Sequence, residues 1–127
     1  EINDEQEDFT RPWLENAPYA PRIEMIVGDV FELLPAMNLH FDMVFIDANK
    51  RQYADYYELV MRFLNPSGYI LADNTLWDGH VVEPEYENDA QTQGIRRFNR
   101  LVAADPRVEN VILPLRDGLT VIRHKGI

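Results

Sequence analysis

The chain has 127 residues, of which 46% are hydrophobic, and its formal charge is −10. This length fits a single globular domain, and the acidity disfavours nucleic acid and anionic membrane as partners, because phosphate binding requires clustered lysine and arginine. There are no cysteines, which excludes disulfides and thiolate metal sites and is typical of a cytoplasmic protein. The apolar runs are far shorter than a membrane span.

The first part of the chain is predicted to alternate helices with strands. In order, we expect a helix, a strand, a helix and a strand at Asp4–Leu14, Ile23–Val27, Val30–Met37 and Phe41–Asp47. Asn3 or Asp4 can cap the first helix, although Pro12 argues against a straight one. The run Met43–Ile46 is uniformly apolar, which is typical of a strand buried on both faces of a parallel sheet.

The alternation continues in the second part. We expect a helix, a strand, a long polar loop, a helix and two strands at Tyr53–Leu64, Tyr69–Asn74, Thr75–Asp89, Ala90–Ala104, Val108–Leu113 and Leu119–His124. Pro66-Ser67-Gly68 predicts a turn, and Asp117-Gly118 predicts an antiparallel hairpin between the last two strands. A loop as long as Thr75–Asp89 is typical of a functional lid or of disorder. The pattern predicts an α/β fold with a mostly parallel sheet and an antiparallel edge.

Oxygen-bearing side chains follow two of the predicted strands. Asp47 ends one strand, and Asp73 and Asn74 end the next along the chain. Ligands of open α/β sheets bind beyond the carboxyl ends of the strands, and carboxylate and amide oxygens suit Mg²⁺ or Ca²⁺. The sequence therefore suggests a divalent-cation site, with helix capping by the same residues as the alternative.

Other residues near predicted strand ends have two interpretations each. Lys50 is either a general base beside the cation or a solvated lysine, although helix N-termini disfavour cations. Gly28-Asp29 either contacts a nucleoside or forms a turn and helix cap. Glu1 is a candidate for binding ribose hydroxyls, as acids at strand ends do in nucleotide folds. Trp77 either stacks on a planar substrate or packs into the core.

Several polar residues of the long loop and the helix after it are predicted to lie in solvent. For His80, a role as ligand or base is the less favoured interpretation. The loop acids and a pair of arginines are interpreted as solvated, namely Glu83, Glu85, Glu87, Asp89, Arg96 and Arg97. They carry no functional prediction.

Three segments together resemble a known family. FDMVFIDANK at Phe41–Lys50, ILADNTLWDG at Ile70–Gly79 and VILPLRDGLTVIRHK at Val111–Lys125 resemble the cation-dependent class I O-methyltransferases. That family includes the caffeoyl-CoA and catechol O-methyltransferases, and the resemblance is closest to the bacterial caffeoyl-CoA-like branch. It covers essentially the whole chain.

The resemblance implies an activity and a set of roles. The expected reaction is cation-dependent methyl transfer from S-adenosylmethionine (SAM) to a hydroxyl of a catechol-like small molecule, in a cytoplasmic homodimer, with Mg²⁺, Mn²⁺ or Ca²⁺. The implied roles are metal binding for Asp47, Asp73 and Asn74, catalysis for Lys50, SAM binding for Glu1, Gly28, Asp29 and Asp47, and acceptor binding for Trp77. Glu1 matches the acid on the SAM ribose, and Gly28 and Asp29 match the adenine-side loop.

The chain departs from the family in one respect. The glycine-rich SAM motif and the first strand of the family's seven-stranded sheet are absent, so residues 1–127 are predicted to be the C-terminal portion of one SAM-dependent methyltransferase domain. That strand separates the strands matched by Ile23–Val27 and Phe41–Asp47, which predicts a gap or an unpaired edge. We therefore expect this chain to complete its sheet through another chain or to bind SAM poorly.

Three rival interpretations stay open on the sequence. A receiver-type phosphoacceptor domain also places a Mg²⁺-binding Asp after a buried strand, but its early acid pair and its later Lys-Pro are not found. A dinucleotide-dependent dehydrogenase would need a Gly-x-Gly-x-x-Gly motif, which is absent. A non-catalytic fragment that only assembles is the third.

Overall fold

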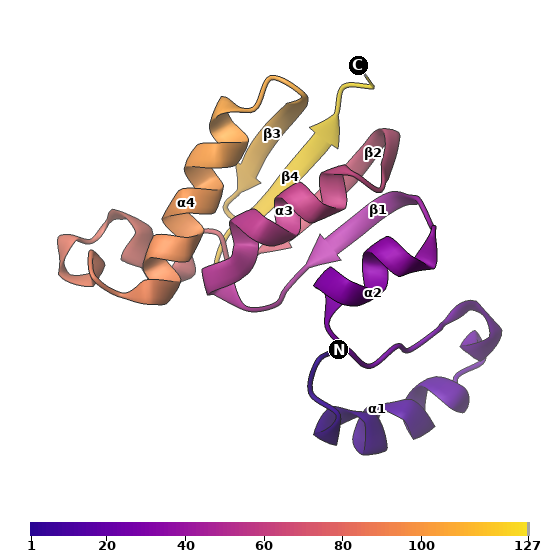
Figure 1. The fold of residues 1–127 in the computed structure, drawn as a ribbon. Coiled ribbons are helices and arrows are strands. Elements are labelled where there is room, and N and C mark those ends of the chain that lie inside the picture. Colours follow the sequence, from indigo (N-terminus) through magenta and orange to yellow (C-terminus); the bar gives the residue numbers. More distant parts are fainter. Residues whose placement is uncertain (127) are drawn as a thin grey trace. The chain divides into compact units, whose positions relative to one another are not determined.

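The computed structural model describes residues 1–126, which divide into two compact units with a boundary after Leu39. The first unit contains α1 (Glu5–Glu15) and α2 (Val30–Met37). The second unit contains the sheet and two helices (Figure 1), namely β1 (Phe41–Ile46), α3 (Tyr53–Met61), β2 (Leu64–Asp73), α4 (Ala90–Ala104), β3 (Val108–Leu113) and β4 (Leu119–His124). None of the helices in residues 1–126 combines the length and the apolar character that a membrane span requires.

Both helices predicted for the first unit are confirmed, but the strand between them is not. Residues 23–27 are assigned to no strand, so the prediction of a strand at Ile23–Val27 is wrong. Ile23 N donates to Ala20 O of the preceding turn at 3.0 Å. Further along, the backbone bonds to Glu1: the Glu1 amino group donates to Ile26 O at 3.1 Å, and Gly28 N, just after the segment, donates to Glu1 O at 2.8 Å. One residue is too short a partner to build a ladder of strand hydrogen bonds.

The second unit contains a four-stranded mixed sheet in the order β1-β2-β4-β3. β1 and β2 are parallel, whereas β4 is antiparallel to both β2 and β3. Three of the four strands therefore run in one direction, and the predicted antiparallel hairpin at the C-terminal end is confirmed. The turn predicted at Pro66-Ser67-Gly68 lies inside β2, where it interrupts the pairing between Phe41↔Leu64 and Met43↔Tyr69 and places Ser67 at φ 63°.

One face of this sheet holds the core of the second unit. α3 and α4 lie on that face (Figure 1), where Tyr53, Tyr57 and Phe98 are fully buried. The rings of Tyr53 and Phe98 meet edge to face at 5.4 Å between centroids, a geometry that aromatic pairs favour. Met43 and Phe45 of β1, by contrast, are 62% and 56% exposed. The prediction that this strand is buried on both faces is therefore wrong, because in this unit both helices lie on the same side.

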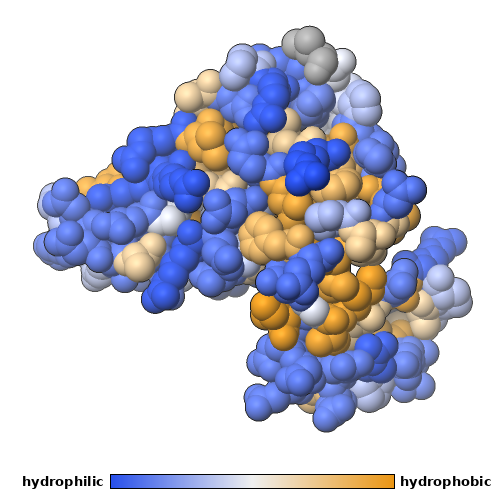
Figure 2. All heavy atoms as spheres, in the orientation of Figure 1, coloured by the Kyte–Doolittle hydropathy of each residue, from blue (hydrophilic) through white to orange (hydrophobic). Residues whose placement is uncertain are grey.

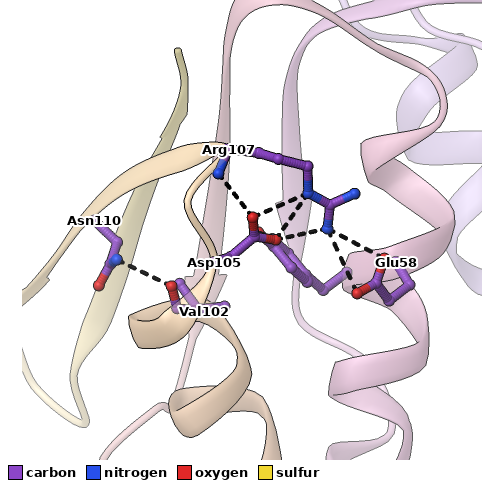
Figure 3. A network of polar contacts seen from close by, with 6 residues as sticks. Glu58, Val102, Asp105, Arg107 and Asn110 are labelled. Carbon is purple, nitrogen blue, oxygen red and sulfur yellow. Dashed lines mark hydrogen bonds and ion pairs between the residues drawn. The ribbon is translucent and has the colours of Figure 1, made fainter. Parts of the chain in front are cut away.

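A polar network joins α3, the end of α4 and the start of β3 (Figure 3). Asp105 accepts hydrogen bonds from the Tyr57 hydroxyl at 2.8 Å and from Arg107 Nη2 at 2.6 Å. Arg107 Nη2 also donates to Glu58 Oε2 of α3 at 3.3 Å. The Asp105 side chain is only 5% exposed, and the hydrogen bonds from Arg107 lower its pKa from 3.8 to about 2. The network stabilises the connection that leads from α4 into the sheet.

This network predicts how stability changes in acid. Because the pKa of Asp105 is lowered in the folded state, its contribution is present above pH 4 and is lost as the pH falls toward 2. Lowering the pKa from 3.8 to about 2 corresponds to about 2 kcal/mol of folding free energy. We expect the difference in unfolding free energy between wild type and Asp105→Asn to shrink by about that amount between pH 5 and pH 2, measured by urea denaturation. Asp55→Asn, which alters an exposed pair 3.5 Å from Arg97, is the control, and an equal trend in both variants would contradict the assignment.

Candidate active site

The predicted oxygen ligands lie at one edge of the sheet. Ile46 pairs with Ala72 in the parallel ladder of β1 and β2, so Asp47 and Asp73 follow equivalent positions at the carboxyl ends of neighbouring strands. Together with Asn74 they line a cavity of about 580 Å³, whose other lining residues are Asp78, Arg116 and Asp117. The structure thus brings the three predicted ligands to one site, and the topology rule for open α/β sheets places a ligand there.

The side chain of Lys50 is held in place beside this cavity. Lys50 begins the 3₁₀ helix η2 (Lys50–Gln52), and its Nζ donates to Asp47 Oδ1 at 2.9 Å and to the Tyr53 hydroxyl at 2.8 Å. Its side chain is 11% exposed, and Nζ lies 4.7 Å from the ring centroid of Tyr53 and 6.0 Å from that of Trp77. The interpretation of Lys50 as a freely solvated lysine is therefore wrong.

Tyr53 is a site residue that the sequence analysis did not identify. Its buried hydroxyl accepts from Lys50 Nζ and donates to the backbone oxygen of Asp73 at 2.7 Å. Burial, and then the charges of Asp47 and Asp73, raise the pKa of the Tyr53 phenol well above its ordinary value, so it stays neutral and keeps the proton it donates. Tyr53 therefore connects Lys50 with the ends of both strands. The Lys-x-x-Tyr spacing, one turn apart, was the available signal.

Unusual backbone conformations cluster around the cavity. Asn74, Trp77, Asp78 and Arg116 all have positive φ, between 48° and 61°. Non-glycine residues seldom adopt this region, and they persist there only where the surrounding structure fixes them. Such outliers concentrate at functional sites, so the backbone independently supports a function for this edge of the sheet.

Helix α4 packs against the segments that carry the site residues. A Cβ atom added at Gly94 would lie 2.3 Å from the backbone oxygen of Lys50 and 2.6 Å from Cα of Arg51, so only glycine allows this close approach of α4 to η2. One turn further along, Asn99 Nδ2 donates to the backbone oxygen of Thr75, directly after the Asp73-Asn74 pair, at 2.9 Å. The sequence predicted α4 only as a helix, and the isolated glycine within it was the missed signal.

The long loop after β2 is ordered into two 3₁₀ helices, η3 (Trp77–Val82) and η4 (Pro84–Tyr86). Arg96 of α4 donates to the backbone oxygens of His80, Val81 and Glu83 at 2.9 to 3.2 Å, so the prediction that Arg96 lies on a solvated face is wrong. The surface over η3, η4 and the start of α4 is largely hydrophilic (Figure 2). The hydrogen bonds from Arg96 attach the backbone of this loop to α4.

Two loop residues make contacts that the sequence did not predict. The ring of His80 stacks on Tyr86 with 3.5 Å between centroids. Asp89 is exposed, as predicted, and it is also the N-cap of α4, where it accepts from both the backbone N and the hydroxyl of Thr92 at 2.8 Å. Trp77 is partly buried against the hydrophobic core near Lys50, so packing is observed and contact with an acceptor stays a prediction.

The predicted SAM-side residues of the first unit lie beside one another. Gly28 N donates to the backbone oxygen of Glu1, whose carboxylate accepts from Asn3 N at 2.8 Å. Asp29 caps α2 and accepts from Phe31 N at 2.9 Å, which is the capping role left open by the sequence. Glu1 also borders a hollow of about 450 Å³, together with Gln6, Thr10 and Met25. Roles for these residues in cofactor binding stay predictions.

The donor set at the cavity fits a hard cation in its chemistry. Among residues 1–126, no group of three or more His, Cys, Asp or Glu side chains is arranged to hold a metal. The predicted ligand set is of another kind, because it has two carboxylates, Asp47 and Asp73, and its third member is the amide of Asn74. Asp73 Oδ1 is occupied by Asn74 N at 2.8 Å and Asp47 Oδ1 by Lys50, which leaves each carboxylate a second oxygen. Oxygen donors of this kind suit Mg²⁺, Mn²⁺ or Ca²⁺.

Comparison with known proteins decides the family. A sequence profile described as O-methyltransferase matches residues 1–125. This chain belongs to the O-methyltransferase family. The match confirms the resemblance drawn from the three segments, and it decides against the receiver-type and dehydrogenase interpretations.

Relatives of this O-methyltransferase-family chain extend well beyond it. It is 34% identical over 135 residues to tricin synthase 2 of Oryza sativa subsp. japonica, with 98% of this chain and 46% of the rice protein covered. It is 33% identical over 138 residues to caffeoyl-CoA O-methyltransferase 5 of Nicotiana tabacum, with 98% and 56% covered. The chain therefore spans about half the length of these curated relatives.

Solved structures confirm the class of fold. An O-methyltransferase from Bacillus cereus in complex with SAH superposes with a TM-score of 0.88 at 30% identity, covering 98% of this chain and 60% of that one. The O-methyltransferase TomG from Streptomyces achromogenes, in complex with SAM, gives 0.89 at 28% identity and the same coverage. The predicted α/β class I methyltransferase fold is confirmed for the part of the sheet that this chain contains.

Proposed function

We propose that this chain is the C-terminal portion of a SAM-dependent O-methyltransferase that uses a divalent cation to methylate a hydroxyl of a catechol-like small molecule. The observation that carries the proposal is the arrangement of Asp47, Asp73 and Asn74 around one cavity, with Lys50 fixed beside it. Family membership supports methyl transfer to oxygen. The cation is inferred from the chemistry of the donor set, and the vicinal diol is what the resemblance to the cation-dependent O-methyltransferases implies.

The lining of the cavity favours an acceptor that is bound through a cation. Its lining includes four carboxylates, Asp47, Asp73, Asp78 and Asp117, with Arg116 as the cationic member. A catechol without a counter-ion would be repelled by these carboxylates as it lost its proton. A bound cation would supply the missing positive charge and stabilise the phenolate. Asp47, Asp73 and Asn74 are the residues that would hold it.

Lys50 is the proposed general base for the hydroxyl proton of the acceptor. In this proposal its Nζ takes the hydroxyl proton of the acceptor, as a general base positioned within hydrogen-bond reach would. SAM, when bound, would supply the methyl group: the acceptor oxygen would bond to the methyl carbon, and the electron pair of the broken carbon–sulfur bond would stay on sulfur. Tyr53 and Asp47 fix the position of Nζ, so this chain contributes chiefly by positioning.

Binding of SAM is the second half of the proposal. The similar structures from Bacillus cereus and Streptomyces achromogenes are complexes with SAH and SAM, which supports the same cofactor here. Glu1, Gly28 and Asp29 are the proposed contacts in the first unit, and Asp47 is a proposed contact in the second. A homodimer and a cytoplasmic location remain proposals of the same kind.

The decisive experiment offers the full-length protein SAM, divalent ions and a panel of catechols, with methyl addition read by mass spectrometry. We expect methylated product with Mg²⁺ or Mn²⁺ and loss of product in excess EDTA. Phenols with a single hydroxyl should be poor acceptors. Turnover that persists in excess chelator would contradict the cation, and methylation of monophenols at equal rates would contradict the diol.

A substitution in the proposed ligand set tests the cation site directly. Asp73→Ala is expected to abolish turnover and to remove its dependence on added Mg²⁺, because one of the two carboxylate ligands is lost. Asp55→Ala is the matched control, since this exposed carboxylate pairs only weakly with Arg97 at 3.5 Å. Equal activity in the two variants would exclude Asp73 from the site.

A further inference from the structure

We propose that Asp117, in the turn between β3 and β4, is a positioning residue that turns the amide oxygen of Asn74 toward the cation site. The inference rests on the proposed function, because it assumes that Asn74 is a cation ligand. It assigns a role to a residue that the sequence marked only as part of a hairpin turn.

The two side chains meet through an ionised acceptor. Asn74 Nδ2 lies 3.1 Å from Asp117 Oδ2, and the backbone N of Asp78 donates to Asp117 Oδ1. An ionised carboxylate has no proton to donate, so only the NH₂ group of an amide can form this bond. The contact with Asp117 therefore fixes the amide orientation: Nδ2 faces the turn, and Oδ1 is left for the cavity that Asn74 lines.

The turn is held firmly against the end of β2. Thr75 N donates to Gly118 O at 3.2 Å, and Leu76 N donates to Asp117 O at 2.9 Å. A Cβ added at Gly118, where φ is +81°, would lie 2.6 Å from Cγ of Leu76, so the two turns pack closely and glycine is required. Because the backbone is fixed on both sides, the Asp117 carboxylate is a rigid acceptor for Asn74.

An isosteric substitution should reverse the amide. In Asp117→Asn one oxygen becomes an NH₂ group. The Asp78 N–H belongs to the backbone and still requires an oxygen, so the new NH₂ group faces Asn74. The Asn74 amide then satisfies it only by turning its own oxygen toward the hairpin, away from the cavity. Residues that orient metal ligands typically change metal affinity by about 10- to 100-fold when they are replaced.

The control is a charge-matched substitution in the same cavity. Asp78→Asn also removes one negative charge from the lining, but the Asp78 side chain is 94% exposed, and its Oδ2 lies 4.0 Å from His80 Nε2. If Asp117 acted only through its charge, the two variants would lose cation affinity equally. If it orients Asn74, only Asp117→Asn should lose about 10-fold or more.

The experiment measures Mn²⁺ binding to the full-length protein by electron paramagnetic resonance of the free ion, without SAM or acceptor. We expect the dissociation constant to rise at least about 10-fold in Asp117→Asn and less than about 3-fold in Asp78→Asn, with unchanged thermal unfolding in both. Equal losses in the two variants would overturn the role of Asp117 while leaving the proposed function intact. Wild-type protein that does not bind Mn²⁺ would overturn both.

Discussion

Replacing Lys50 with alanine is expected to lower kcat by about 100- to 10,000-fold, the range that general acid–base catalysis usually contributes. KM for the acceptor should change much less, because the proposed cation ligands Asp47, Asp73 and Asn74 all remain. A loss in kcat without a matching loss in binding identifies an interaction made in the transition state. The measurement is steady-state kinetics of the full-length protein with a catechol acceptor.

Two controls separate proton transfer from packing. Lys50→Arg keeps a positive charge beside Asp47 but offers a group that does not give up its proton in proteins, so it should be nearly as inactive as Lys50→Ala. Arg51→Ala changes the exposed neighbouring residue and should leave kcat within about twofold, as surface substitutions generally do. A Lys50→Arg variant with wild-type turnover would show that charge alone suffices and would exclude Lys50 as the base.

The sequence predicted the candidate cation ligands better than the residues that position them. Asp47, Asp73 and Asn74 were found because each follows an apolar strand, and parallel strands end at the same edge of a sheet. Gly94 and Asp117 were missed because their roles depend on contacts between segments far apart in sequence: Gly94 of α4 closely approaches the backbone of Lys50 in η2. Tyr53 lies only three residues after Lys50, but the hydrogen bond from its hydroxyl to the backbone oxygen of Asp73 also joins distant segments. Periodicity describes one element at a time and contains no information about such contacts.

The errors in the fold have the same origin. Ile23–Val27 has the composition of a strand, but a strand also requires a neighbouring strand, and the backbone of this segment bonds to Ala20 of the preceding turn and to Glu1. Met43 and Phe45 were predicted to be buried because of their apolar run, yet the sheet is covered by α3 and α4 on one face (Figure 1). Local pattern predicts which segments can form strands, and the surrounding elements decide whether they pair and which faces are covered.

Gly94→Ala is the second substitution for which we expect a large effect. On helix propensity alone this change should stabilise α4 by up to about 1 kcal/mol. We expect the opposite, a loss of about 1 to 3 kcal/mol, which is typical of overpacking. The added methyl would meet backbone atoms of Lys50 and Arg51 at 2.3 and 2.6 Å, and backbone cannot rotate away as a side chain can. Urea denaturation measures this change in unfolding free energy.

The steric clash in Gly94→Ala should also displace Lys50 in the active site. Relief requires η2 to move away from α4, and Lys50, which begins η2, moves with it. Since misplacing a catalytic group by about 1 Å can cost on the order of 100-fold in rate, we expect a kcat loss of that size in protein that remains folded. Arg100→Ala, at an exposed position of the same helix, should retain wild-type stability and turnover. A Gly94→Ala variant that is more stable than wild type and equally active would show that the close approach of α4 to Lys50 has no part in positioning the base.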